Sequence, residues 1–192
     1  QMFEVNQVVS NLPEGYYQVN MTGYYRDGNR EALQQKIING TAPARHAMLY
    51  IEYKGKGDEV PLPSIAEGIN QCPGIGWKGA AGEQPDNVMD AAEYFECGLY
   101  KVYTHIIKVG SDGELTLGVT KDKQVDGDWA VFDNFRLTYF GKHVSQATIN
   151  DIDKIKDNVV KNGKIYNLYG MEVKRPLKRG IYICNGKKII VK

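Results

Sequence analysis

Short runs of alternating apolar and polar residues, separated by turns rich in glycine, proline and asparagine, cover most of this chain. Alternation with a period of two is typical of β-strands that bury one face. The pattern predicts strands at residues 3–9, 16–26, 47–53, 59–62, 99–109, 114–120 and 129–140. In the long strand at 16–26, one face carries the following candidate core residues: Tyr17, Val19, Met21, Gly23 and Tyr25.

Two short helices are expected between these strands. Asn29 can N-cap the first helix, and Gly40 can end it. Asp86 or Asn87 can cap the second helix, which ends at Gly98. The apolar stripes of the helices are Leu33 and Ile37 in the first, and Val88, Ala91, Ala92 and Phe95 in the second.

The order of the predicted elements indicates an all-β fold. Antiparallel turn signals join most of the strands, and helices do not alternate with strands as a parallel sheet would require. We therefore predict an antiparallel β-sandwich with short helical insertions at residues 1–141. Residues 142–162 are polar and weakly patterned, and are interpreted as a linker. A small C-terminal β-unit is expected at 163–192, where two β-rich runs meet at Asn185-Gly186, a pair that favours a type I′ turn.

Composition excludes some classes of partner. A net charge of +1 with 24% charged residues gives no basis for binding nucleic acid. No run approaches the roughly 20 apolar residues of a membrane helix, so no membrane span is expected. Three cysteines without a CxxC spacing do not suggest a zinc site. Cys72 and Cys97 could form a disulfide in an oxidising compartment, or remain two buried thiols.

The C-terminal residues carry a first resemblance to a known family. The pattern Asn167-Leu168-x-Gly170-x-x-Val173, followed by Lys-Arg-Gly-Ile-Tyr-Ile-Cys-Asn-Gly-Lys-Lys-Ile-Ile-Val-Lys, resembles the C-terminal sorting-type tail of secreted and surface proteins of Bacteroidetes-type bacteria. The resemblance implies a secreted or cell-surface location. Because no export signal is visible at Gln1–Val5, the sequence suggests that such a signal, and N-terminal partner domains, belong to a longer parent chain.

A second resemblance spans most of residues 3–141. It is carried by Leu-Pro-Glu-Gly-Tyr-Tyr at 12–17, by Asp-Ala-Ala-Glu-Tyr-Phe-Glu-Cys-Gly-Leu-Tyr at 90–100 and, most distinctively, by Asp-Trp-Ala-Val-Phe-Asp-Asn-Phe-Arg-Leu at 128–137. Together these segments look like the galactose-binding-like jelly-roll modules of Bacteroidetes surface proteins, which are relatives of carbohydrate-binding modules. The resemblance implies a jelly roll with an accessory binding role, and it transfers no particular binding residue.

The glycine-rich segment 67–85 is predicted to be a long loop that carries Trp77. An exposed indole can stack on the apolar face of a sugar ring, with nearby polar groups binding hydroxyls. The alternative is that Trp77 folds back to close one end of the sandwich. The candidate ligand-binding set contains Trp77, Lys78, Glu83 and Gln84 on this loop, and Tyr25 and Arg26 at the end of the strand before the 29–46 insertion.

Asp133 falls on the same strand parity as Trp129, Val131 and Leu137, which predicts that it points inward. A lone buried carboxylate is costly, so either hydrogen bonds or a structural calcium ion should satisfy it. Glu4 is the other candidate calcium ligand. A hydrogen-bonded carboxylate is the favoured interpretation, and no cofactor is required by the sequence.

Catalysis finds little support in these residues. The three histidines lie on separate segments, and no serine sits in a GxSxG elbow. Gly74–Gly79 matches the GxGxxG fingerprint in form only, because neither a preceding strand nor a following helix is predicted. The favoured hypothesis is a non-catalytic module that binds a glycan or cell-surface polysaccharide. The alternative is a structural or protein-interaction module that spaces or anchors a larger parent protein.

Overall fold

The computed structural model describes residues 1–144 and, beyond them, 165–167, 172–173, 180–184 and 187–191. The chain divides into two compact units, Gln1–Val144 and Ser145–Lys192. The first unit begins with the predicted sandwich and extends slightly past residue 141. Residues 145–162 of the predicted linker lie outside the described residues.

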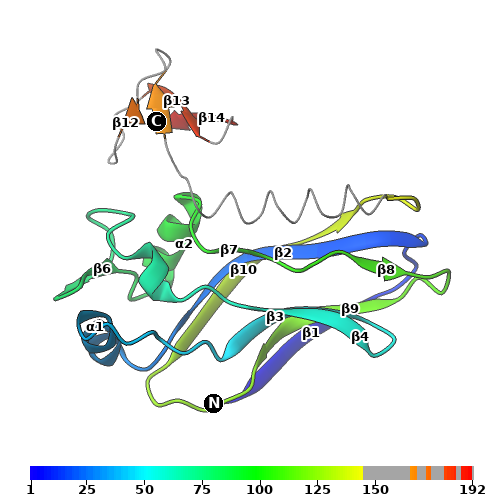
Figure 1. Ribbon diagram of the computed structural model, residues 1–192, viewed down its shortest axis with the longest axis horizontal. Helices are drawn as coiled ribbons and strands as arrows, with labels where there is room; N and C mark the ends of the chain where they lie inside the picture. Colours follow the sequence, from blue (N-terminus) through cyan, green and yellow to red (C-terminus); the bar gives the residue numbers. More distant parts are fainter. Residues whose placement is uncertain (145–164, 168–171, 174–179, 185–186, 192) are drawn as a thin grey trace. The chain divides into compact units, whose positions relative to one another are not determined.

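Two antiparallel sheets form the body of the first unit (Figure 1). Their strands are β1 (Phe3–Val9), β2 (Gly15–Arg26), β3 (Ala47–Tyr53), β4 (Lys56–Pro61), β7 (Lys101–Tyr103), β8 (Ile107–Val109), β9 (Leu115–Lys121) and β10 (Trp129–Tyr139). The first sheet has the order β1-β9-β3-β4. In the second sheet, β10 pairs with one side of β2, while β7 and β8 share the other side. The prediction of a mostly β chain with antiparallel sheets is confirmed.

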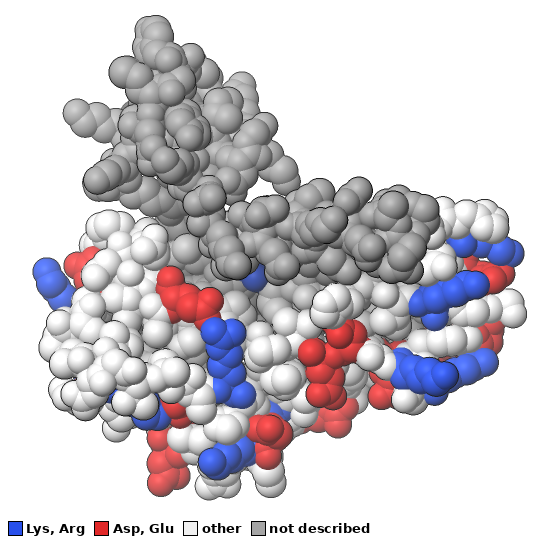
Figure 2. Space-filling model, viewed as in Figure 1, with Lys and Arg blue, Asp and Glu red and all other residues white. Residues whose placement is uncertain are grey.

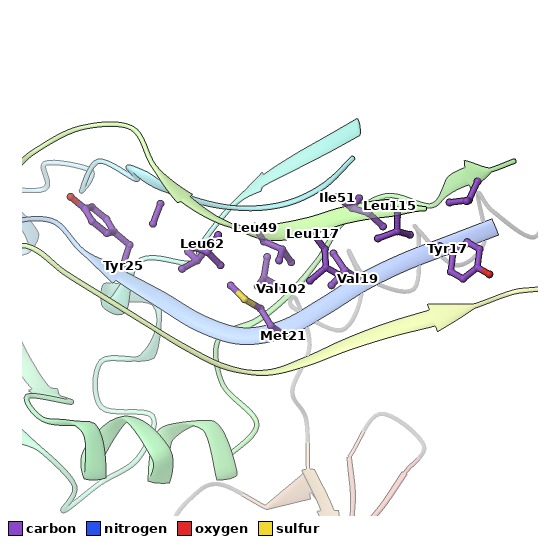
Figure 3. Packing of buried hydrophobic residues seen from close by; sticks show 13 residues of the cluster. Tyr17, Val19, Met21, Tyr25, Leu49, Ile51, Leu62, Val102, Leu115 and Leu117 are labelled. Carbon is purple, nitrogen blue, oxygen red and sulfur yellow. The ribbon is translucent and has the colours of Figure 1, made fainter. Parts of the chain in front are cut away.

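The main core lies between the two sheets (Figure 3). Burying one large aliphatic or aromatic side chain there stabilises the fold by roughly 1.5–3 kcal/mol. The buried members are Tyr17, Val19, Met21, Tyr25, Ala47, Leu49, Ile51, Leu62, Val102, Val109, Leu115, Leu117 and Val119. The inward face predicted for the long strand is therefore confirmed for its four large side chains.

A second apolar cluster occupies the opposite face of β2 at one end of the unit. It contains Tyr24, Leu33, Ile65, Cys72, Ala91, Tyr94 and Tyr100. The helices α1 (Arg30–Ile38) and α2 (Val88–Glu96) lie at this end (Figure 1). Because Tyr24 contacts this cluster while Tyr25 contacts the sandwich core, β2 is buried on both faces along this stretch.

Both helices begin at the predicted caps. The side-chain oxygen of Asn29 accepts a hydrogen bond from the Ala32 amide, and that of Asn87 accepts from Met89 and Asp90. The predicted stripe of the second helix is only partly right. Its buried residues are Ala91 and Tyr94, with Phe95 partly buried, whereas Val88 and Ala92 are exposed.

The segment predicted to be a long loop contains a 3₁₀ helix at Ile65–Gly68 and a two-stranded hairpin, β5 (Trp77–Gly79) with β6 (Gly82–Gln84). The loop prediction is therefore wrong. Asn70 explains why such short strands persist, because its main-chain N–H donates to the Glu83 carbonyl (3.0 Å) and its side-chain oxygen accepts from the Glu83 amide (2.9 Å). A disulfide joins Cys72 to Cys97 and ties this segment to the end of α2.

The single strand predicted at 99–109 is divided into β7 and β8. Between them the Gln18 side chain donates to the Thr104 carbonyl (2.8 Å), and the Asp58 carboxylate accepts from the His105 amide (2.6 Å). Side chains replace the β-ladder partners at these two positions, so the chain bends away from β2 without leaving these main-chain groups unsatisfied.

Asp133 shares a face of β10 with Trp129 and Val131, which pack against the second cluster and not the main core, and a β-bulge follows it. Asp133 pairs with Thr22, but Arg136 pairs with Asn20, so β10 holds one extra residue. Asn134 absorbs this residue with a left-handed φ of 58°. Ala130 and Phe132 face the main core before the bulge, and Leu137 faces it afterwards, whereas Asp133 is exposed. The inward position predicted for Asp133 is wrong.

The second unit contains one antiparallel sheet with the order β12-β11-β13-β14. Its strands are β11 (Ile165–Asn167), β12 (Glu172–Val173), β13 (Gly180–Cys184) and β14 (Lys187–Val191). Cys184 pairs with Lys187, which agrees with the predicted hairpin. The Asn185-Gly186 turn itself lies outside the described residues.

Among the described residues, no helix is long and apolar enough to cross a membrane. Lys and Arg are interspersed with Asp and Glu on the face of the first unit that Figure 2 shows.

Candidate functional site

The β5–β6 hairpin separates the predicted ligand-binding residues onto two faces. Trp77 pairs with Gln84, and Lys78 pairs with Glu83. Residues directly opposite in an antiparallel pair point to the same face. Gln84 is fully buried, whereas Lys78 is exposed. Trp77 therefore points toward the protein with Gln84, and Lys78 and Glu83 form the outer face.

The inward face of the hairpin packs against α1. The Gln34 side chain donates to the Gln84 side chain (3.1 Å) and accepts from the Ala81 amide. Gly79 leaves room for the indole, since a Cβ built there would lie 2.4 Å from Cζ3 of Trp77. The Arg30 guanidinium lies over the indole, 4.9 Å from its centroid. Trp77 is half-buried. This is intermediate between the two alternatives from the sequence, an exposed indole and one that folds back to close the sandwich.

Asp86 connects Trp77 to the other tryptophan of the chain. Its carboxylate accepts from Arg30 and, at 3.1 Å, from Arg26. The Arg26 guanidinium lies 5.2 Å from the centroid of Trp129. We call these five residues (Arg26, Arg30, Trp77, Asp86 and Trp129) the tryptophan–arginine cluster. Strand β2, helix α1, strand β5, the segment after β6 and strand β10 each supply one member.

The two arginines of the cluster differ in their freedom to bind a ligand. Arg26 is 13% exposed, and its three nitrogens donate to Gly28, Asp86 and Gly127. Arg30 is 39% exposed and donates through Nε to Glu31 and through Nη1 to Asp86. Among the described residues, Nη2 of Arg30 has no hydrogen-bond partner. Arg26 is therefore a fixed support, while Arg30 offers donors to solvent.

The charges of this region balance locally. The hydrogen bonds with Glu31 and then Asp86 raise the pKa of the Arg30 guanidinium above its ordinary value. Two guanidinium groups face two carboxylates, Asp86 and Glu31. A neutral ligand with several hydroxyls matches this arrangement better than a polyanion does, because donors, acceptors and aromatic surface are present without excess positive charge.

The structure does not bring Tyr25 into the cluster. Tyr25 is fully buried in the sandwich core, where its hydroxyl donates to Asp128 (2.7 Å). Burial, and then the hydrogen bond to this carboxylate, raise the pKa of Tyr25. Arg26, the next residue on β2, points to the opposite face and joins the cluster.

The two predicted calcium ligands lie on different sheets. Glu4 on β1 accepts from Tyr50 (2.6 Å) and Asn6 (3.1 Å), and the Tyr50 hydrogen bond is the main cause of the lowered pKa of Glu4. Asp133 lies on β10, where its side chain accepts from the Asn134 amide (2.7 Å). No interaction joins them, and the described residues contain no group of three or more acidic, histidine or cysteine side chains placed to share a metal ion.

No family model, curated protein or solved structure matches this chain. The candidate site therefore rests on geometry alone. Sequence reasoning named Trp77 and Arg26 as ligand-binding residues, but not Arg30, Asp86 or Trp129. For Arg30 and Asp86 the available signal was their position next to the helix N-caps Asn29 and Asn87, because a cap fixes where the helix starts.

Proposed function

We propose that residues 1–144 form a non-catalytic binding module for a glycan, carried by an exported or surface-attached bacterial protein. The export assignment rests on the resemblance of the C-terminal residues to a sorting-type tail. The chain crosses from one sheet to the other between β1 and β2, between β2 and β3, between β8 and β9 and between β9 and β10, and these crossings support a jelly-roll arrangement.

The observation that carries the proposal is the tryptophan–arginine cluster. Both tryptophans of the chain are half-buried, and the bridge Arg26–Asp86–Arg30 connects them. Aromatic rings beside a few fixed polar groups are the usual composition of a small-ligand site. In this proposal the solvent-facing parts of Trp77 and Trp129 contact the apolar face of a sugar.

The polar members have separate roles. Arg30 donates hydrogen bonds to hydroxyls through its free nitrogen, and Asp86 accepts from them through its partly exposed carboxylate. Arg26 holds Asp86 in place from the inner side. Preorganised donors and acceptors of this kind lower the entropic cost of binding.

The test begins with a glycan array on the purified chain, followed by affinity electrophoresis with each glycan that binds. Trp77→Ala should weaken retention at least tenfold. Lys78→Ala is the matched control, because Lys78 lies on the same strand but points to the outer face. Equal retention of wild type and Trp77→Ala on a confirmed glycan would refute this site.

One observation favours a second function for the same cluster. A guanidinium covers part of each indole, and Asp86 bonds both arginines, so the five residues also clamp α1, the hairpin and β10 together. A module that only spaces or anchors a parent protein needs this clamp and no ligand. An array without binding, together with a lowered melting temperature for Trp77→Ala, would support this structural role.

A further inference from the structure

The two four-stranded sheets of the first unit end in four edges, and three of these are protected against pairing with another strand. An unprotected edge presents free main-chain N–H and C=O groups that a further strand can bind. Edge β4 carries Lys56, Asp58 and Glu59 and ends at Pro61. The edge opposite β10 consists of two three-residue strands, β7 and β8, and β10 itself carries the bulge. Charge, proline, short strands and bulges are the known protective devices.

Edge β1 has no proline, no bulge and no break into short strands, and it carries a single charge. It pairs with β9 over seven consecutive residues without a register shift and contains no lysine, arginine or proline. Its one charged residue, Glu4, accepts a hydrogen bond from the hydroxyl of Tyr50 on β3 of the same sheet. Among the described residues, no main-chain group of residues 3–9 bonds to a partner other than β9.

Apolar side chains accompany this edge. Val5 lies on the same face of β1 as Phe3 and Val9, which pack against the main core. Val5 itself is nevertheless 55% exposed. Val8, on the other face, is 53% exposed. The core is therefore accessible to solvent along β1, and an added strand would cover apolar side chains as well as main-chain groups.

We propose that β1 pairs antiparallel with β1 of a second copy of this chain, with the two-fold axis between the Asn6 residues. In that register all seven residues pair, and Phe3 lies opposite Val9 of the second copy. Val5 lies opposite Gln7 of the second copy, and Glu4 lies opposite Val8, so no like charges meet. A two-fold axis perpendicular to the sheet does not exchange its two faces. The core-facing sides of the two copies therefore lie on the same side of the joined sheet and form one continuous surface.

A second copy fits this edge because the register about Asn6 places the partly exposed Phe3 and Val9 opposite each other and the one charged residue, Glu4, opposite an uncharged one. Seven residues a side is far below the roughly 20–30 residues of a standard interface, so the dimer is weak and depends on concentration. This inference is independent of the proposed glycan function, because β1 contributes no residue to the tryptophan–arginine cluster.

Sedimentation velocity of the full chain from micromolar to millimolar concentration tests the proposal. The mass of the wild type should rise toward twice the 21.6 kDa of the monomer. Val5→Lys should raise the dimer dissociation constant at least tenfold, because it places a charge beside the axis. Val88→Lys is the matched control, since Val88 is 69% exposed on α2 and should leave dimerisation unchanged. A wild type that stays monomeric throughout would overturn the proposal.

Cross-linking tests the register itself and does not depend on the folding of Val5→Lys. Directly opposed residues of an antiparallel pair have Cα atoms about 4.5–5.5 Å apart, within the range of a disulfide. Asn6→Cys in a Cys184→Ser background should therefore form a disulfide dimer on mild oxidation. Glu59→Cys on the protected edge β4 is the control and should not. Equal cross-linking of both variants, or none by Asn6→Cys, would overturn the register.

Discussion

The most buried ion pair among the described residues gives the sharpest prediction about stability. Lys121 ends β9 and Asp128 precedes β10, and their side chains are 4% and 7% exposed. The Asp128 carboxylate bonds Lys121 and also accepts from the buried Tyr25 hydroxyl at 2.7 Å. Lys121→Met keeps the length of the aliphatic chain and leaves this carboxylate with the hydroxyl as its remaining partner.

The expected loss of stability is about 3 kcal/mol. Breaking a buried ion pair from one side costs about 3–5 kcal/mol, because the remaining charge is buried without compensation. The low end applies here, since Tyr25 still donates to Asp128. For a domain of this size, about 3 kcal/mol corresponds to a fall of roughly 10 °C in melting temperature.

Urea unfolding followed by tryptophan fluorescence measures this loss. The double variant Lys121→Met/Asp128→Asn should recover part of it, because both charges are gone and the amide oxygen still accepts from Tyr25. Lys142→Met is the control, since it breaks the exposed pair with Glu14 (2.7 Å) and should leave the midpoint unchanged. A Lys121→Met midpoint equal to that of wild type, or a double variant less stable than the single one, would refute the reasoning.

Two further predictions concern the disulfide and a tyrosine. Replacing Cys72 and Cys97, 25 residues apart, with serine should lower the free energy of unfolding by about 3–4 kcal/mol on the chain-entropy relation; equal urea midpoints with and without the disulfide would contradict this. Burial, and then the Glu4 hydrogen bond, raise the pKa of Tyr50 to about 12, from an ordinary value of 10.0. Because the folded state holds this proton more tightly, the stabilisation is complete below pH 10 and is lost as the pH rises toward 12. Tyr50→Phe should therefore show a smaller loss of stability across that interval; an unchanged alkaline profile would count against the shift.

Sequence reasoning succeeded where a local rule decides the structure. The alternation from Tyr17 to Tyr25 placed four side chains in the core, because a strand repeats every two residues whatever its partners are. Asn29 and Asn87 marked both helix starts, because an N-cap satisfies amides within its own first turn. These features depend on residues that are neighbours along the chain.

Sequence reasoning failed where a structural feature depends on a contact with a residue far away along the chain. The hairpin that carries Trp77 has three-residue strands, too short to show a period, and a contact from Asn70 supports it. Asp86 and Arg30 lie 56 positions apart, so their ion pair cannot be seen in either local pattern. The residue types of the candidate site were partly identified, while its geometry required the fold.

The bulge in β10 connects the wrong prediction for Asp133 to the proposed dimer. The prediction placed Asp133 on one inward face with Trp129, Val131 and Leu137, but the extra residue at Asn134 puts Leu137 on the face opposite Trp129 and Val131. Asparagine tolerates the left-handed conformation that this bulge requires better than most residues do. The bulge leaves Phe135 42% exposed while keeping Leu137 against the core. It also interrupts the hydrogen-bonding row of β10, which makes that edge a poor template for a new strand. Edge β1 of the other sheet has no such interruption. It lies close to β10, because the ring centroids of Phe3 on β1 and Phe132 on β10 are 6.2 Å apart. Of these two neighbouring edges, only β1 retains a regular row, and this difference places the proposed strand pairing there.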